Sequence, residues 1–214
     1  MSRLVLAVAF AGGVVAAGIG SFVWSRAAPH PPARSAAELM DVVMWGREPI
    51  GGPFALIDHT GARRTDTDFR GKLLLIYFGF TYCSDACPID LQSIAGALDR
   101  LGPLAERVQP LFITVEPERD TPDQLASYVA QFHPRLIGLT GDPREVRKVL
   151  RAYKVYAAKS AAGPAERDSP DVDHSSLVYL VDTAGKYVGY FPPGTDADRM
   201  VEVIRQQLAV VVQR

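Results

Sequence analysis

K-L-L-L-I-Y-F-G-F-T-Y-C-S-D-A-C-P-I-D, residues 72 to 90, is the stretch of this 214-residue chain that decides its fold. It begins with an uncharged apolar run, Leu73 to Phe78, which predicts a strand buried on both faces of a sheet. Gly79 to Tyr82 interrupts the run, and apolar residues then recur from Pro88 to Leu101 with the spacing of a helix. A buried strand that turns directly into a helix indicates an α/β fold.

The only two cysteines of the chain, Cys83 and Cys87, lie at this predicted strand-to-helix turn. Residues at i and i+4 share one face of a helical turn, so the two thiols can close a disulfide or hold one metal ion. We expect the free N–H groups and the positive end of the helix to favour the thiolate form. Two inert buried thiols or a purely structural disulfide are weaker interpretations, because both cysteines gather at one turn and a disulfide there would close a very small loop.

The N-terminal part predicts a membrane anchor. Leu4 to Trp24 is 21 residues without a charged side chain, which at about 1.5 Å per residue crosses a bilayer core of about 30 Å. A cleaved signal peptide is the alternative, and Ala27-Ala28 suits cleavage, but its apolar region usually has about 7–15 residues. We therefore predict an uncleaved anchor at 1–26, a proline-containing linker at 27–48 and one domain at 49–214.

Charge and cysteine usage bear on the compartment. Positively charged residues do not decide the orientation, because Arg3 precedes the apolar stretch while Arg26 and Arg34 follow it. A dithiol without other cysteines is typical of an oxidising compartment, so we expect a single-pass protein of the inner membrane with its domain in the periplasm or otherwise outside the cytoplasm. The formal net charge of -1 predicts no nucleic-acid partner, because such binding needs a concentrated basic face.

The remaining sequence predicts alternating strands and helices without an internal repeat. We expect a hairpin at 54–58 and 63–65, strands at 108–115, 136–139 and 155–158, helices at 123–133 and 142–153, a second hairpin at 177–181 and 186–191, and a last helix from about 195 to 213. A βαβ core followed by a hairpin and a terminal helix indicates a thioredoxin-like α/β fold, with a central sheet flanked by helices and an N-terminal hairpin.

His174 is the third candidate ligand beside Cys83 and Cys87. A lone histidine is more often structural, but this one lies between an aperiodic polar segment and an apolar strand. Two thiolates suit Cu(I), and an added imidazole also suits Cu(II), whereas a structural zinc site usually has four protein ligands. Asp171 and Asp173 beside it either orient the ring or keep the loop solvated. From the residues alone, a metal site and a redox dithiol are equally supported.

Other polar residues have structural interpretations. The loop Glu116 to Pro122 follows the carboxyl end of a predicted strand, where open α/β folds place function. The same loop is equally typical of a helix start, with Thr121 as its cap. His30 falls in the predicted linker, His59 in an exposed turn and His133 at a helix end, so none of the three is expected to be a ligand.

Four motifs carry a family resemblance: F-T-Y-C-S-D-A-C-P at 80–88, V-E-P-E-R-D-T-P at 115–122, L-T-G at 139–141 and D-H-S-S at 173–176. Through them, and over about residues 54–208, the sequence resembles the Sco/SenC family of membrane-anchored copper proteins. Cys-x3-Cys combined with a distant Asp-His-Ser is the specific mark. The resemblance implies a thioredoxin-like fold with copper held by Cys83, Cys87 and His174. It also implies delivery of copper to the dinuclear copper site in cytochrome c oxidase subunit II, or reduction of the thiols of that site.

The sequence departs from the family at one position and leaves two functions open. Glu116 stands where the family usually has Asp before Pro, so no role is carried over to it. A membrane-anchored copper chaperone is the leading hypothesis, with subunit II of the oxidase and other copper-handling proteins as its partners. The alternative is a membrane-tethered thiol–disulfide reductase, in which Cys83 attacks and Cys87 resolves the mixed disulfide. Cys-x3-Cys spacing, and D-H-S-S where reductases of this fold carry a proline, count against it. A peroxiredoxin-type peroxidase is disfavoured, because no proline leads the segment from Thr81 to Cys83.

Overall fold

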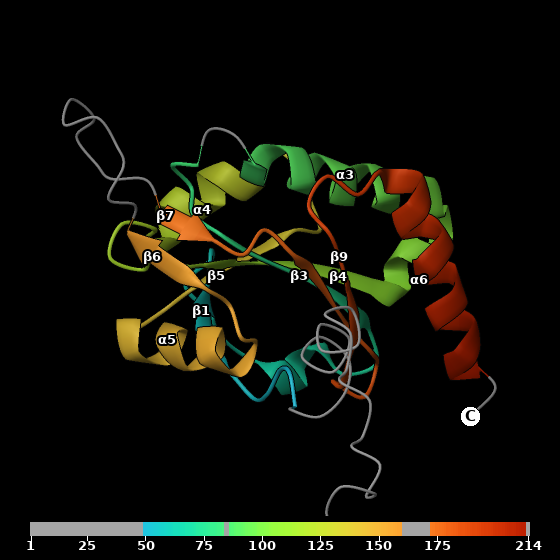
Figure 1. Cartoon of the computed structure of the whole chain (residues 1–214), viewed down its shortest axis with the longest axis horizontal. Coiled ribbons are helices and arrows are strands. Elements are labelled where there is room, and N and C mark those ends of the chain that lie inside the picture. Colours follow the sequence, from blue (N-terminus) through green and yellow to red (C-terminus); the bar gives the residue numbers. More distant parts are fainter. Residues whose placement is uncertain (1–48, 84–85, 160–171, 213–214) are drawn as a thin grey trace, which may run out of the picture. The chain divides into compact units, whose positions relative to one another are not determined.

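The computed structural model describes residues 49–83, 86–159 and 172–212 (Figure 1). They belong to one compact unit, Met44–Arg214. The predicted anchor at 1–26 and the predicted linker at 27–48 both lie outside the described residues. Within the described ranges, no helix combines the length and the apolar character that a membrane crossing requires.

A seven-stranded mixed sheet forms the centre of the fold, in the order β2-β1-β5-β4-β3-β8-β9. Its strands are β1 (Ala55–Asp58), β2 (Arg63–Thr65), β3 (Leu73–Gly79), β4 (Val108–Thr114), β5 (Ile137–Thr140), β8 (Val178–Val181) and β9 (Tyr187–Phe191). β3 runs parallel to β4 and antiparallel to β8. Every residue of β3 is buried, as the uncharged run predicted.

Helices cover both faces of this sheet. α3 (Ala86–Leu101), α4 (Pro122–Val129) and α6 (Ala197–Val212) contribute to one apolar core, into which Leu75 and Tyr77 of β3 point. α5 (Pro143–Ala152) covers the other face, where it shares a core with Ile76 and Phe78. Figure 1 shows α3 and α6 side by side, away from α5. A central sheet flanked by helices is the thioredoxin-like α/β fold that the sequence predicted.

Three short segments have structure that the sequence did not predict. β7 (Val172–His174) pairs antiparallel with β6 (Ala157–Lys159) in a separate two-stranded sheet. Two 3₁₀ helices are present as well: η1 (Asp66–Phe69) links β2 to β3, and η2 (Gly102–Arg107) links α3 to β4. Such short elements were missed because three to six residues show too little periodicity, although the Pro at the start of η2 and the acidic first turn of η1 are their local signals.

α4 ends at Val129, earlier than the predicted His133. The N–H groups of Gln131 and Phe132 donate to the carbonyls of Tyr128 and Val129, three residues before them. Such bonds tighten the last turn into a 3₁₀ form before the chain leaves the helix ahead of Pro134. The prediction was wrong here because apolar spacing continues through this tighter turn.

Candidate metal centre

Sheet topology brings three distant segments to one edge. β3 and β4 are parallel, with Gly79 opposite Thr114, so the loops that follow both strands leave the sheet at the same place. β8 is antiparallel to β3 and starts with Val178 opposite Tyr77, so the chain just before β8 arrives at that edge too. The loop after β3 carries Cys83, and the segment before β8 carries His174.

The three predicted ligand residues lie together at this edge. Cys87, the second residue of α3, is fully buried, while Cys83 and His174 are half-buried. The Cys87 Sγ and the His174 Nε2 are 3.5 Å apart, and the ligand atoms of all three side chains lie within 4.8 Å of one another. Cys83 and Cys87 are not joined in a disulfide. Two sulfurs and one imidazole at such distances offer one ion a soft, three-ligand site of the kind that Cu(I) and Cu(II) prefer.

Room for the Cys87 sulfur exists because residue 79 has no side chain. A Cβ placed on Gly79 would lie 2.9 Å from the Cys87 Sγ and 2.9 Å from the Phe112 ring. The His174 imidazole packs edge-on against two other rings, with centroid distances of 6.2 Å to Tyr77 and 5.8 Å to Phe80. The ligands are therefore enclosed by apolar and aromatic walls that limit their rotation. In the sequence, Gly79 was only a break in the apolar run.

Asp120 holds the turn that leads to Cys83. Its carboxylate, which is 0% exposed, accepts hydrogen bonds from the Thr81 N–H at 3.1 Å, the Thr81 hydroxyl at 2.6 Å and the Thr114 hydroxyl at 2.6 Å. The sequence left the loop 116–122 open between function and helix capping. It caps α4, because the Thr121 Oγ1 accepts from the Gln124 N–H at 3.3 Å, and it also fixes the Cys83 turn. Sequence reasoning missed Asp120, whose signal was its place in the R-D-T-P motif.

Glu116 connects the same loop to the rim of the site. It is buried, and its carboxylate pairs with the Arg119 guanidinium at 3.2 Å. That guanidinium lies over the Tyr82 ring, 4.1 Å from the ring centroid, a cation–π arrangement. Tyr82 is exposed and directly precedes Cys83. Glu116 thus keeps a structural task at the position where the sequence departs from the family.

The prediction that the helix start favours thiolate was wrong for Cys87. Its interaction with the Cys83 side chain and its burial raise the pKa of the Cys87 thiol far above the usual range. The Phe80 backbone N–H and the Tyr77 hydroxyl oppose this effect but do not outweigh it. Two neighbouring sulfurs cannot both ionise easily when one of them is buried, so the first turn of α3 is not enough to lower the pKa of Cys87.

The remaining histidines have structural contacts where the structure describes them. His59 is half-buried rather than exposed, because its Nδ1 accepts the Gly138 N–H at 3.1 Å. His133 lies four residues beyond the end of α4 rather than at a helix end, and its Nδ1 accepts the Arg135 N–H at 3.1 Å. His30 and Asp171 lie outside the described residues, and so does the side chain of Asp173.

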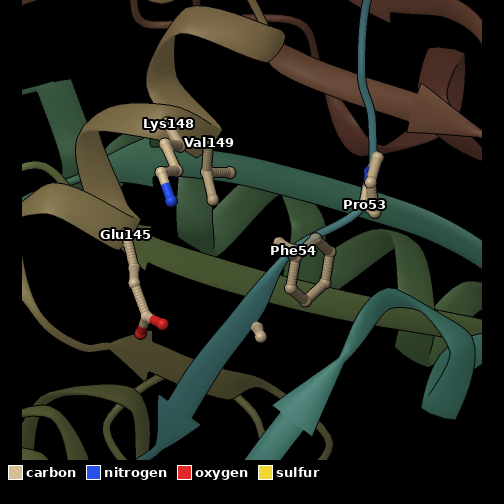
Figure 2. A pocket seen from close by; sticks show the side chains of 6 residues that line it. Pro53, Phe54, Glu145, Lys148 and Val149 are labelled. Atoms are coloured by element: carbon tan, nitrogen blue, oxygen red, sulfur yellow. The ribbon is translucent and has the colours of Figure 1, made fainter.

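A cavity of about 260 Å³ lies elsewhere in the molecule (Figure 2). Its lining includes Phe54 and Val149, which belong to the core on the α5 face, together with Glu145 and Lys148 of α5. Cys87 belongs to the core on the α3 face. The cavity is therefore separate from the cysteines and His174.

Comparison with known proteins extends the similarity over most of the chain. The SCO1/SenC family model matches residues 43–209. A mitochondrial SCO2 homolog of Danio rerio is 39% identical over 216 residues, which cover 99% of this chain and 74% of that protein. A mitochondrial SCO1 homolog of Homo sapiens is 44% identical over 149 residues, which cover 68% of this chain. That alignment takes in 48% of the human protein, so this chain matches about half of its length.

Solved structures share the fold. ScoI of Bradyrhizobium japonicum, with copper bound, is 40% identical and superposes with a TM-score of 0.68 over 74% of this chain and 99% of that chain. Yeast Sco1, with copper bound, is 36% identical with a TM-score of 0.68, covering 76% of this chain and 90% of that one. The similarity thus extends from the motifs to the three-dimensional arrangement.

Proposed function

Because the chain belongs to the SCO1/SenC family, we propose that it binds copper through Cys83, Cys87 and His174 and helps to assemble the dinuclear copper site of cytochrome c oxidase. The observation that carries the proposal is the cluster of two sulfurs and one imidazole within 4.8 Å. Copper is bound in the related Bradyrhizobium and yeast proteins. In this chain copper is a cargo, and the client is subunit II of the oxidase.

The difference in burial between Cys83 and Cys87 sets the order in which the ligands dissociate from copper. Cys83 is half-buried and Cys87 is fully buried. A thiolate of the client can therefore approach the copper ion from the side of Cys83. It replaces Cys83 as a ligand first, while Cys87 and His174 remain bound to the copper. Exchange of one thiolate for another leaves the charge of the complex unchanged, so no charged intermediate has to form in the apolar surroundings.

The location is part of the proposal. Residues 1–26 would anchor the protein in the inner membrane through Leu4 to Trp24. Residues 27–48 would connect this anchor to the domain at 49–214, which would hold the copper site in the periplasm or an equivalent space outside the cytoplasm. The 21 uncharged residues from Leu4 to Trp24 support the anchor, and the use of both cysteines in one site supports an oxidising compartment.

Direct interaction of the two thiols supports a second candidate, a thiol–disulfide reductase. The Cys83 thiolate would attack a disulfide of the client and release one client thiol. Cys87 would then displace the second client thiol, leaving a Cys83–Cys87 disulfide. Two electrons pass to the client, and the two protons come from the thiols of this chain. His174 has no step in this reaction.

Copper transfer separates the two functions. The full chain, loaded with Cu(I), is mixed with the reduced copper-binding domain of oxidase subunit II, and the copper bound to that domain is measured after the two proteins are separated. The metal-free, reduced chain is tested separately against the oxidised domain. We expect His174→Ala to lose copper delivery and to keep thiol reduction, while the control His133→Ala keeps both. Undiminished delivery by His174→Ala would contradict the proposed copper function.

A further inference from the structure

Polar atoms without an ordinary hydrogen bond gather round the metal centre. Of the buried side-chain atoms in this state among the described residues, the Tyr77 hydroxyl, one Asp90 oxygen and the His174 Nδ1 belong to this neighbourhood. A buried polar group without a partner costs about 1–3 kcal/mol of stability. Several such groups in one place indicate a role other than holding the fold together.

Tyr77 lies against two of the three candidate ligands. Its side chain is 0% exposed and belongs to the same core as Cys87. A point above Gly79, where a Cβ would stand, is 3.0 Å from the Tyr77 Cε1 and 2.9 Å from the Cys87 Sγ, so the ring edge and the sulfur flank the same small space. The Tyr77 ring also meets the His174 imidazole edge-on at 6.2 Å.

The surroundings of the Tyr77 hydroxyl are closed and polar. Asp90, one turn after Cys87 on α3, is 2% exposed and accepts the Gly194 N–H at 2.9 Å with its Oδ1. Its carboxyl and the Ser176 hydroxyl are the other polar groups that influence the Tyr77 hydroxyl. The phenol group is therefore buried, on a ring that lies beside the Cys87 sulfur.

Metal binding creates a need for a hydrogen-bond donor beside Cys87. A metal-bound cysteine is a thiolate, and Cys87 would carry its negative charge at a fully buried position. Such a charge needs hydrogen-bond donors. The Tyr77 hydroxyl is a buried donor without a hydrogen-bond partner, and it belongs to the ring whose edge flanks this sulfur.

We propose that Tyr77 is a positioning residue of the metal centre, whose hydroxyl donates a hydrogen bond to the Cys87 thiolate once a metal is bound. The inference rests on the proposed function, because it takes Cys87 as a copper ligand. A hydrogen bond to a ligand sulfur withdraws electron density from it and so sets how strongly it donates to the metal. Tyr77 thereby tunes the strength with which the chain holds its cargo.

Removal of one oxygen atom tests the proposal. The full chain is purified in detergent as wild type, Tyr77→Phe and Tyr179→Phe. Tyr179 is the matched control, because it is also buried but belongs to the core on the α5 face. Cu(I) affinity is measured by competition with a coloured chelator. The sulfur-to-copper absorption of the Cu(II) form is recorded as well.

We expect Tyr77→Phe to bind Cu(I) about 10- to 100-fold more weakly, the usual effect of losing a partner of a metal ligand. Its sulfur-to-copper absorption should move to longer wavelength, because a thiolate without the hydrogen bond is a stronger electron donor. Tyr179→Phe should match the wild type in both measurements. A Cu(I) affinity within twofold of the wild type and an unchanged spectrum in Tyr77→Phe would overturn the proposal. Unfolding of Tyr77→Phe would also overturn it, because the hydroxyl would then be needed for the stability of the fold.

A Cys87→Ser variant distinguishes failure of the Tyr77 proposal from failure of the proposed copper function. If the wild type binds copper, Cys87→Ser does not, and Tyr77→Phe equals the wild type, only the role of Tyr77 fails. If Cys87→Ser binds as tightly as the wild type, the proposed function fails with it, because Cys87 is then not a ligand.

Discussion

Replacement of Asp120 by alanine tests how the turn before Cys83 is held in place. The Asp120 carboxylate is the acceptor for the Thr81 N–H, the Thr81 hydroxyl and the Thr114 hydroxyl. After its removal, the Thr114 hydroxyl, on a residue that is 0% exposed, and the Thr81 N–H lose their acceptor. The Thr81 hydroxyl is on a half-buried residue and can turn to water.

The expected cost follows from the two donors that lose their acceptor. Each buried donor left without a partner costs about 1–3 kcal/mol, so Asp120→Ala should lower the free energy of unfolding by about 2–6 kcal/mol. The control is Asp123→Ala on the exposed first turn of α4. It removes only a favourable charge near a helix start, worth about 0.3–1 kcal/mol.

Urea unfolding of the compact unit Met44–Arg214, reduced and metal-free, measures both changes. Thr114→Val provides a further check, because it removes one of the stranded donors. The double variant Asp120→Ala with Thr114→Val should therefore be more stable than the sum of the single losses predicts, by about 1 kcal/mol or more. An Asp120→Ala cost no larger than that of Asp123→Ala, or strict additivity in the double variant, would refute the reasoning.

Three further predictions concern the site and the acid stability of the fold. Gly79→Ala adds a Cβ 2.9 Å from the Cys87 Sγ; we expect a loss of about 1–3 kcal/mol in urea unfolding and weaker copper binding, and equal binding by Gly79→Ala and the control Gly96→Ala on α3 would contradict this. The Cys83 side chain and burial raise the pKa of the Cys87 thiol, so Cu(I) binding must release the proton of that thiol. The Cu(I) affinity measured by chelator competition should therefore rise between pH 6 and 8, by about tenfold per pH unit for each proton released. An affinity that does not change with pH would contradict this prediction. Hydrogen bonds to Asp58 outweigh its burial and lower its pKa from 3.8 to about 2, so about 2.5 kcal/mol of stability, present above pH 4, should disappear as the pH falls to 2. Asp58→Asn should remove that part of the acid dependence, and an unchanged profile of unfolding free energy against pH would disprove it.

The central strand and its turn were predictable because their signals are local. Seven residues of β3 are buried, and the uncharged run Leu73 to Phe78 already required a strand covered on both sides. The turn that follows contains both cysteines of the chain. Their concentration at one turn indicated a reactive or metal-binding site. The order of strands and helices then leads to the thioredoxin-like arrangement.

Contacts between distant segments explain what the sequence did not reveal. Asp120 meets Thr81 across 39 positions of sequence, and the close approach of Gly79 to Cys87 depends on how α3 packs on β3. The high pKa of the Cys87 thiol was mispredicted because burial and a neighbouring sulfur are tertiary effects, whereas the helix start is a local one. β7 was missed because its pairing with β6 spans a segment with no periodic pattern.

Copper titration of the reduced chain without air is the most direct measurement of the proposed three-ligand site. Wild type, Cys83→Ser, Cys87→Ser, His174→Ala and the control His133→Ala are titrated with copper, and the bound metal per chain and the sulfur-to-copper absorption are recorded. We expect one copper per chain for the wild type and His133→Ala, and a weakened complex with an altered spectrum for the other three. Tight binding that survives His174→Ala with an unchanged spectrum, or no stable complex in the wild type, would contradict a copper site made of Cys83, Cys87 and His174.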